Sequence, residues 1–333
     1  MPEGHSVHRI ARQFDRNYVG RRVMASSPQG RFVEGASLID GRAAASVRAV
    51  GKQMFLEFEG DLWLRVHLGM YGAWDFAGEI LVDPTIGSAN GRMGQTNQRG
   101  TDLEGDPVFD AAGENSLTSI GAPRRTRVHV RMSEQTTGLA DEDDQWPPPV
   151  VGQVRLRLMT DITCADLRGP TACQIQDPDE VAATIAKLGP DPLVDDVAEG
   201  EERFVAAVRK KATPIGLLLM DQAVVSGIGN VYRAEMLYRA NLDPHTPGRD
   251  VPEELVRGLW RDWVRLLSIG VETGQMMTMD DLDPDAYRRA MAHRDDRHWV
   301  YHRAGLPCRV CGTEIVLEEM GARKLYWCPV CQR

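Results

Sequence analysis

Apolar residues recur at different intervals along the chain, and these intervals predict different elements. Near the start, Val7, Ile10 and Phe14 lie three and four positions apart, which predicts an amphipathic helix over residues 3–17. From residue 22 onward the pattern changes to short alternating stretches separated by Gly and Asp, which predict antiparallel strands. The predicted strands are 45–50, 54–60, 62–70, 126–132 and 151–160.

Helical spacing returns at Asp179, and the helix that begins there is ended by Gly189 and Pro190. The further predicted helices are 201–222, 230–240 and 253–274. Residues 83–124 are polar and rich in Gly with no clear period, and residues 134–149 are typical of a flexible acidic loop, so mobile insertions are expected within about 85–150. Strands followed by helices predict an α+β protein with more than one domain.

The composition is that of an ordinary globular protein, with 333 residues of which 42% are hydrophobic. The sequence contains no apolar run of about 18 residues and no signal segment, so a cytoplasmic protein is expected. A net charge of -9 argues against a nucleic-acid partner. However, the acidic residues concentrate in 102–106, 139–145 and 191–202, whereas Lys and Arg outnumber them in 287–333. A basic face therefore remains compatible with this charge.

Four cysteines at the end of the chain have the spacing of a metal site. Cys308 and Cys311, and likewise Cys328 and Cys331, are separated by two residues, which suits a tetrahedral zinc ion held by a hairpin. An iron–sulfur cluster is the alternative. Four thiolates leave no open position, so such a zinc is structural. Cys164 and Cys173 are expected to be small buried apolar residues.

Other features permit both a structural and a functional interpretation. If Met1 is removed, Pro2 carries a free secondary amine, although Pro2 and Glu3 also suit the start of a helix. The turn before Asn230 either caps a helix or binds phosphate. Lys52 is either an ordinary exposed lysine in water or a residue with a role in the function of the protein.

Met70 and Tyr71 are expected at a hairpin tip. Such a pair is commonly part of a core, but it also suits the gap that a flipped base leaves in DNA.

Taken together, several motifs resemble the formamidopyrimidine-DNA glycosylase and endonuclease VIII family. They are MPEG, GK before a strand, HLGMYG, LGPDPL, DQAVVSGIGNVYRAE, VYHRAGLPC and the cysteine pairs. The resemblance implies an N-terminal β-sandwich flanked by the first helix, a helix-two-turn-helix domain and a C-terminal zinc-finger hairpin. The corresponding boundaries are 1–178, with the insertion at about 85–150, then 179–297 and 298–333.

The resemblance also implies roles for individual residues. Pro2 corresponds to the nucleophile, Glu3 to its acid/base partner, and Lys52 to a phosphate-binding or proton-relaying residue. Asn230 and Arg323 correspond to residues that hold the phosphates beside the lesion.

The departures from the family pattern bear on the substrate. His5 and Ser6 stand where a proline and a glutamate are common, and DLRGPTAC keeps Arg168 to face the orphaned base but lacks the usual Phe wedge. With Met70 and Tyr71 available as gap-filling residues, the pattern is closer to the endonuclease VIII branch. This branch implies oxidised pyrimidines such as thymine glycol and 5-hydroxyuracil.

The expected protein is thus a bifunctional DNA glycosylase and abasic-site lyase of base excision repair. It would act through a Schiff base on Pro2 with β,δ-elimination, hold one structural zinc, bind damaged DNA as a monomer, and associate with the nucleoid. Two alternatives remain open. One is a lyase that acts only on existing abasic sites, and the other is a non-catalytic protein that binds damaged DNA.

Overall fold

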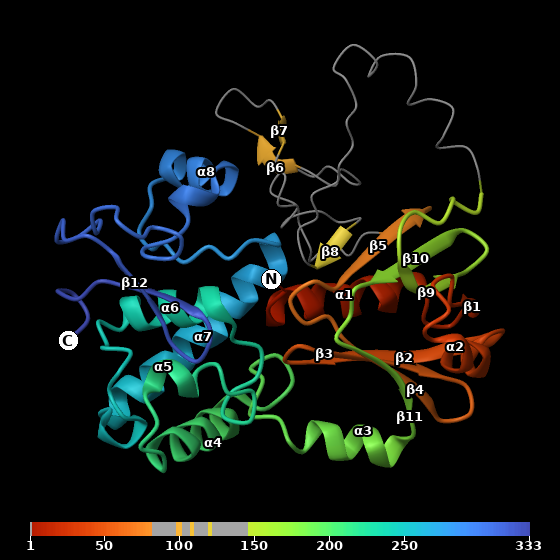
Figure 1. Cartoon of the computed structure of the whole chain (residues 1–333), viewed down its shortest axis with the longest axis horizontal. Helices are drawn as coiled ribbons and strands as arrows, with labels where there is room; N and C mark the ends of the chain where they lie inside the picture. Colours follow the sequence, from red (N-terminus) through yellow and green to blue (C-terminus); the bar gives the residue numbers. More distant parts are fainter. Residues whose placement is uncertain (1, 82–97, 102–106, 110–118, 122–145) are drawn as a thin grey trace.

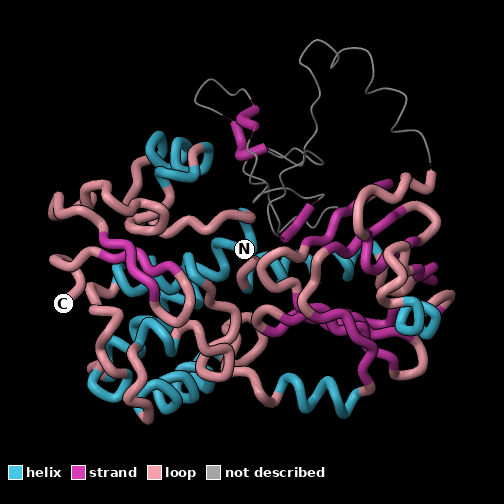
Figure 2. The backbone as a smooth tube through the Cα atoms, viewed as in Figure 1, coloured by secondary structure: helices cyan, strands magenta, loops and turns pink. Residues whose placement is uncertain are grey.

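The computed structural model describes residues 2–81, 98–101, 107–109, 119–121 and 146–333. A β-rich domain and a helical domain lie side by side, and α1 (Gly4–Asn17) begins at their junction (Figure 1). A short C-terminal hairpin lies against the helical domain (Figure 2). The N-terminal residues are therefore placed between the domains.

The β domain is one antiparallel sheet that folds over on itself. Its order is β11-β4-β3-β2-β1-β9-β10-β5-β8. The strands are β1 (Arg22–Ser26), β2 (Arg42–Val50), β3 (Gln53–Phe58), β4 (Leu62–His67), β5 (Ala73–Gly78), β8 (Ser119–Gly121), β9 (Val154–Met159), β10 (Thr163–Arg168) and β11 (Ala172–Gln176). The first half of β1 pairs with β2 and the second half with β9, so β1 forms the corner between two layers. The predicted sandwich is confirmed.

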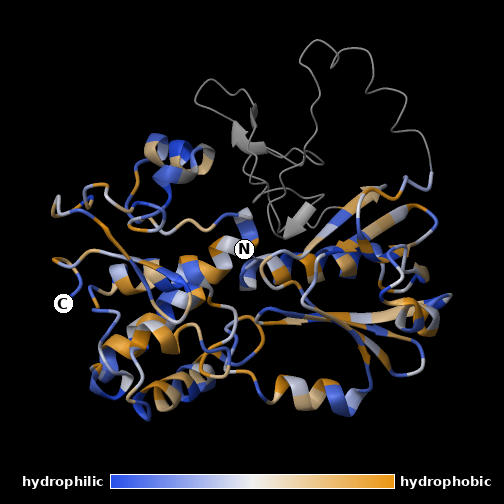
Figure 3. Cartoon of the chain, in the orientation of Figure 1, coloured by the Kyte–Doolittle hydropathy of each residue, from blue (hydrophilic) through white to orange (hydrophobic). Residues whose placement is uncertain are grey.

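The apolar side of α1 belongs to the core of this sandwich. Phe14 is fully buried and packs against Trp74 and Phe76 of β5. Val7 and Ile10 join the same core, as their spacing predicts. Orange and blue residues alternate along α1 and several strands in Figure 3, so these elements turn an apolar side toward the core.

The helical domain consists of α4 (Val197–Arg209), α5 (Ile215–Leu218), α6 (Asn230–Arg239) and α7 (Glu253–Thr273), with a short 3₁₀ helix η1 (Gly248–Asp250). The helix predicted over 201–222 is wrong as a single element, because Pro214 has no N–H to donate and becomes the N-cap of α5. The helix predicted over 253–274 is confirmed, and Gly274 ends it in a left-handed conformation.

The remaining elements are α2 (Val33–Ile39), α3 (Pro178–Ile185), α8 (Pro284–Ala292), the 3₁₀ helix η2 (Arg294–Asp296), and the hairpins β6 (Gln98–Thr101) with β7 (Pro107–Phe109) and β12 (Val316–Glu319) with β13 (Lys324–Trp327). The strand predicted at 126–132 lies outside the described residues. Within 85–150, where the only element predicted is the strand 126–132, β8 extends the main sheet beside β5. Among the described helices, none has the length and hydropathy of a membrane span.

Candidate active site

The start of α1 is bound to the turn that precedes α6. The Gly4 amide donates to the Gly227 carbonyl at 2.8 Å. This approach requires glycine, because a Cβ on Gly4 would lie 2.9 Å from the Cα of Gly227 and one on Gly229 would lie 2.4 Å from the carboxyl carbon of Glu3. The Gly-rich turn predicted to bind phosphate thus also receives the N-terminus of the chain.

Glu3 is fully buried at the N-terminal end of α6. Its carboxylate accepts hydrogen bonds from the amides of Gly229 and Val231, both at 2.9 Å, and of Tyr232 at 3.4 Å. Burial raises the pKa of the Glu3 carboxyl, while Lys52 and the amides oppose this rise. Such a carboxyl can hold a proton nearer to neutral pH than an exposed glutamate, as a general acid must.

Lys52 enters the same site from the β2–β3 turn. Its Nζ donates to the Ile228 carbonyl at 2.7 Å, and the preceding residue, Gly51, has a left-handed φ of 56°. Burial lowers the pKa of the lysine to about 8; Glu3 opposes the shift and Arg323 adds to it. Lys52 therefore changes charge within the range in which enzymes work.

Pro2 is buried directly before α1. Met1, whose removal would free the Pro2 amine, lies outside the described residues. The structure thus places two segments, the chain start with Pro2 and Glu3 and the β2–β3 turn with Lys52, against the turn before α6, where Glu3 and Lys52 bind backbone groups.

Asp191, in the segment between α3 and α4, links α1 to the β2–β3 turn. Its buried carboxylate accepts from His8 Nε2 at 2.8 Å, from the Gly51 amide at 2.6 Å and from the Leu193 amide at 2.9 Å. Burial alone would raise the pKa of Asp191, but the bond and charge of His8 and the amides outweigh it, so the pKa lies below its ordinary value. Asp191 thereby fixes α1 relative to the turn that carries Lys52.

Asn230 lies where α6 meets the C-terminal hairpin. Its Nδ2 donates to the Lys324 carbonyl at 2.7 Å, and its Oδ1 accepts from Arg233 at 2.6 Å. The Asn230 side chain is 6% exposed. In this structure its amide joins the helical domain to the hairpin, so only an exchange of partners would free it for a phosphate.

Arg323 and Met70, from the C-terminal hairpin and the β domain, contact each other. Arg323, in the turn between β12 and β13, donates from Nη1 to the sulfur of Met70, in the loop after β4. The neighbouring Tyr71 is 76% exposed. Both predicted gap-filling residues are thus on a loop at the surface, and Met70 touches the predicted phosphate-binding arginine.

Arg168, at the end of β10, is instead paired within the sheet. Its guanidinium lies 3.3 Å from Asp75 and 3.7 Å from Asp166. The structure therefore does not group Arg168 with Pro2, Glu3 and Lys52.

The four terminal cysteines fit a zinc ion. All four sulfur atoms lie within 4.8 Å of one another, with Cys308 and Cys331 3.9 Å apart and Cys311 and Cys328 3.5 Å apart. A tetrahedral zinc with bonds of about 2.3 Å separates its sulfurs by about 3.8 Å. Tyr238 of α6 contacts the Cys308 sulfur at 3.2 Å, so this site also anchors the hairpin to the helical domain.

Sequence profiles of known families cover most of the chain. The formamidopyrimidine-DNA glycosylase N-terminal domain matches residues 1–173, the H2TH domain of that glycosylase matches 188–281, and the zinc finger found in these glycosylases and in isoleucyl-tRNA synthetase matches 305–333. Endonuclease 8 1 of Mycobacterium tuberculosis is 35% identical over 332 residues, which cover 100% of both proteins. The chain belongs to the formamidopyrimidine-DNA glycosylase and endonuclease VIII family.

Other members of this glycosylase family match less of the sequence or share only the fold. The formamidopyrimidine-DNA glycosylase of Thermus thermophilus is 35% identical over 150 residues, which cover 44% of this chain and 54% of that protein. A Lactococcus lactis Fpg mutant in complex with DNA containing Fapy-dG has a TM-score of 0.68 at 19% identity, with full coverage of both chains. As a family member, the protein is a DNA-repair glycosylase and abasic-site lyase with one structural zinc.

Sequence reasoning missed several buried charged residues of this glycosylase. Arg233 and Glu235 face different neighbours of α6, and Glu235 accepts from the amides of Trp299, Val300 and Tyr301 at 2.7 to 2.9 Å. The sequence of α6 does not show the one apolar and one polar face of a surface helix, because charged residues alternate with apolar ones around it. This pattern was the available signal that the helix is buried on all sides and that its charged residues have partners.

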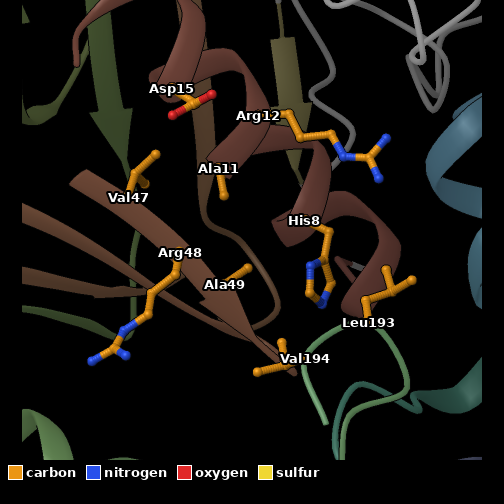
Figure 4. Close-up of a pocket in the computed structure, with 9 residues that line it drawn as sticks. All are labelled: His8, Ala11, Arg12, Asp15, Val47, Arg48, Ala49, Leu193 and Val194. Atoms are coloured by element: carbon orange, nitrogen blue, oxygen red, sulfur yellow. The ribbon is translucent and has the colours of Figure 1, made fainter. Parts of the chain in front are cut away.

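A pocket of about 430 Å³ lies elsewhere on α1, between this helix, β2 and the turn at Leu193 and Val194 (Figure 4). His8, Arg12 and Arg48 are among its lining residues, whereas Pro2, Glu3 and Lys52 are not. The pocket is thus separate from the candidate catalytic residues.

Proposed function

We propose that this glycosylase removes oxidised pyrimidines and then cuts the strand, with Pro2 as the nucleophile. The catalytic part of this proposal rests on the buried Glu3 carboxyl, which three amides hold next to Pro2 and near Lys52, whose pKa is lowered. The choice of oxidised pyrimidines rests on the similarity to endonuclease 8 1. A binding protein has no need to bury an acid beside an amine. The costly burial of a carboxyl is explained by proton transfer.

In the proposed reaction, the Pro2 nitrogen bonds to C1′ as the bond from C1′ to the base breaks, and the base leaves with a proton. Glu3 protonates the sugar ring oxygen, so that the ring opens and an iminium forms. Loss of a proton from C2′ then breaks the bond to the 3′ phosphate, and loss of a proton from C4′ breaks the bond to the 5′ phosphate. Water finally releases Pro2.

Charged residues at the mouth of the site suit the DNA backbone. We propose that Lys52 and Arg323 bind the phosphates beside the lesion, because two cations near one acid favour an anionic ligand. Asn230 would join them by exchanging the Lys324 carbonyl for a phosphate oxygen.

Met70 and Tyr71 would fill the space left by the turned-out nucleotide, which their exposure on a loop supports. Arg168 could face the orphaned base only after leaving Asp75 and Asp166.

We further propose functional units at 1–178, 179–297 and 298–333, with α3 as the connection between the first two. The protein would act as a monomer in the cytoplasm, on chromosomal DNA in the nucleoid.

Borohydride trapping tests the mechanism. The protein would be mixed with an oligonucleotide that carries one thymine glycol, or one abasic site, and the reduced adduct would be located by peptide mass spectrometry. Adducts on Pro2 from both substrates are expected. An adduct from the abasic strand alone would indicate a lyase or a different base, and no adduct from either would favour a binding protein.

A further inference from the structure

The loop that follows α6, residues 241–247, contacts the C-terminal hairpin and the residues after it. The Leu242 carbonyl accepts from Nε2 of Gln332 at 3.1 Å, and the Asn241 carbonyl accepts from the amide of Arg333 at 3.4 Å. Peptide groups and side-chain amides do not titrate near neutral pH, so these bonds do not depend on pH there. His245 adds a contact between the same parts that does depend on protons.

Both ring nitrogens of His245 face carboxylates. Nδ1 is 2.8 Å from Oδ1 of Asp243, in the same loop, and Nε2 is 2.6 Å from Oε1 of Glu318, on β12. The ring also packs edge-on against Trp327 of β13, with ring centres 5.2 Å apart. His245 thus joins the loop to both strands of the hairpin.

This arrangement requires the charged form of the ring. A neutral imidazole has a proton on one nitrogen and a lone pair on the other, whereas an ionised carboxylate can only accept. Two carboxylates at hydrogen-bond distance from the two nitrogens therefore need a proton on each, which is the imidazolium form. Loss of one proton breaks one of the two bonds and leaves a lone pair facing a carboxylate.

Asp243 and Glu318 stabilise the charged ring against its partial burial. Burial lowers the pKa of His245, but the hydrogen bonds and charges of the two carboxylates outweigh it, so the pKa lies above its ordinary value of 6.5. Arg233 of α6 interacts electrostatically with Glu318, which helps to keep that carboxylate ionised. The imidazolium form therefore persists to a higher pH than in an ordinary exposed histidine.

The remaining charged groups of the elements around His245 lie on the other side of the hairpin. Glu319 and Lys324 are opposite each other in the register of β12 and β13, and alternation places them on the face away from Glu318. Besides His245 itself, the loop contains Asp243 as its one ionisable residue, and α5, which bonds to the loop through two backbone amides, has no titratable side chain. Asp243 and Glu318 are therefore the groups that set the charge of His245.

We propose that His245 is a positioning residue for DNA binding, because its protonated ring holds the hairpin, and with it Arg323, against the helical domain. Glu318 is two residues before Met320, where the turn that carries Arg323 begins. The bond to His245 therefore acts on the hairpin beside that turn. The inference rests on the proposed contact of Arg323 with a phosphate.

The bond makes DNA affinity depend on pH. Because the pKa of His245 is raised in the folded protein, the bond is complete below 6.5 and is lost as the pH rises through the raised value. A hairpin that is held less firmly is in the DNA-binding arrangement for a smaller fraction of the time, and the affinity falls in proportion. Exposed ion pairs contribute modestly, so the expected loss is about two- to fivefold.

The first measurement follows the histidine ring signals of the full chain by NMR as the pH is raised. The signal of His245, assigned by its absence in His245→Gln, should titrate above 6.5. Glu318→Gln should lower that pKa, because the amide has the shape of the carboxylate without its charge. A pKa of His245 at or below 6.5, or one that Glu318→Gln leaves unchanged, would overturn the inference.

The second measurement is the affinity for a duplex oligonucleotide with an uncleavable abasic analogue, at constant salt from about pH 5.5 to 9. The parent should bind about two- to fivefold more tightly than His245→Ala at the acidic end and about equally at the alkaline end. His245→Gln, whose amide donates to a carboxylate at every pH, should keep a constant ratio to His245→Ala. The His245 side chain is 44% exposed, so these variants are expected to fold. If the ratio of the parent to His245→Ala did not change with pH, the inference would be wrong.

Two further variants complete the test. His293→Gln removes an exposed histidine at the end of α8 and is the matched control, so its affinity should equal that of the parent at every pH. Arg323→Gln tests the proposed function separately and should bind DNA more weakly than the parent. Equal binding by Arg323→Gln and the parent would refute the phosphate contact, whereas the NMR titration would still decide whether a charged His245 holds the hairpin.

Discussion

Substitution of Gly229 by alanine tests whether the position of Glu3 governs catalysis. The new Cβ would lie 2.4 Å from the carboxyl carbon of Glu3 and 2.6 Å from its Oε1, whereas ordinary contacts begin at 3.4 Å. Glu3 must therefore move by about 1 Å, since the clash falls on a buried side chain. The backbone angles of Gly229, φ -119° and ψ -157°, are extended, so the effect comes from the contact and not from the conformation.

This displacement has two measurable consequences. Overpacking of this kind lowers the free energy of unfolding by about 1 to 3 kcal/mol. A displacement of about 1 Å from the reacting geometry slows catalysis about 100-fold. Thermal unfolding would report the first effect, and single-turnover cleavage of an abasic oligonucleotide would report the second.

Gly258→Ala is the matched control. Gly258 is exposed within α7, and a Cβ there meets no atom within 4 Å. This variant should gain about 0.5 to 1 kcal/mol of stability and keep the parent's cleavage rate. If Gly229→Ala also cleaved at the parent's rate, the assignment of Glu3 as a positioned acid would be refuted.

Three further predictions concern other parts of the molecule. Because the pKa of Lys52 is about 8, cleavage that depends on its charged form should decline as the pH rises through about 8. The Lys52→Gln variant should cleave about 100-fold or more slowly and should lack this decline. A pH–rate profile of both proteins would show the difference. Cys328→Ser should lose zinc and DNA affinity together, and unchanged metal content by elemental analysis would contradict the site. Asp191→Asn should lower the free energy of unfolding by about 2 to 4 kcal/mol at neutral pH. Because the pKa of Asp191 is depressed in the folded state, this difference should disappear as the pH falls through that value, and a constant difference in urea unfolding would contradict it.

Local patterns in the sequence predicted much of the fold. The apolar spacing of α1 and α7 placed both helices within one residue of their ends, because each buries one continuous face. The alternation in β2, β3 and β4 predicted the three strands in the right order, with ends that differ from the structure by up to three residues. Strand β5 was missed as an element of its own, because its identity depends on pairing with β10, more than 80 residues away.

The sequence predicted which residues belong to the site, but it did not predict the hydrogen bonds that hold them in place. Pro2, Glu3 and Lys52 stood out through motifs, and the structure brings them together. Asp191 could not be recognised as their common support, because its partners at His8 and Gly51 come from distant segments. The partners of Asn230 were likewise hidden, since they depend on how the C-terminal hairpin packs against α6.

The bonds from Glu3 to α6 also set an order of events during synthesis. They join residues separated by 226, 228 and 229 positions, so the carboxylate has no amide partners until most of the chain has been made. At about 5 to 20 residues per second, roughly 10 to 50 s pass between synthesis of Glu3 and synthesis of Tyr232. During this interval the first residues cannot yet be enclosed against α6. Removal of Met1 by an aminopeptidase, which the proposed nucleophile requires, therefore has its opportunity on the ribosome, before the last domains close around the amine it exposes.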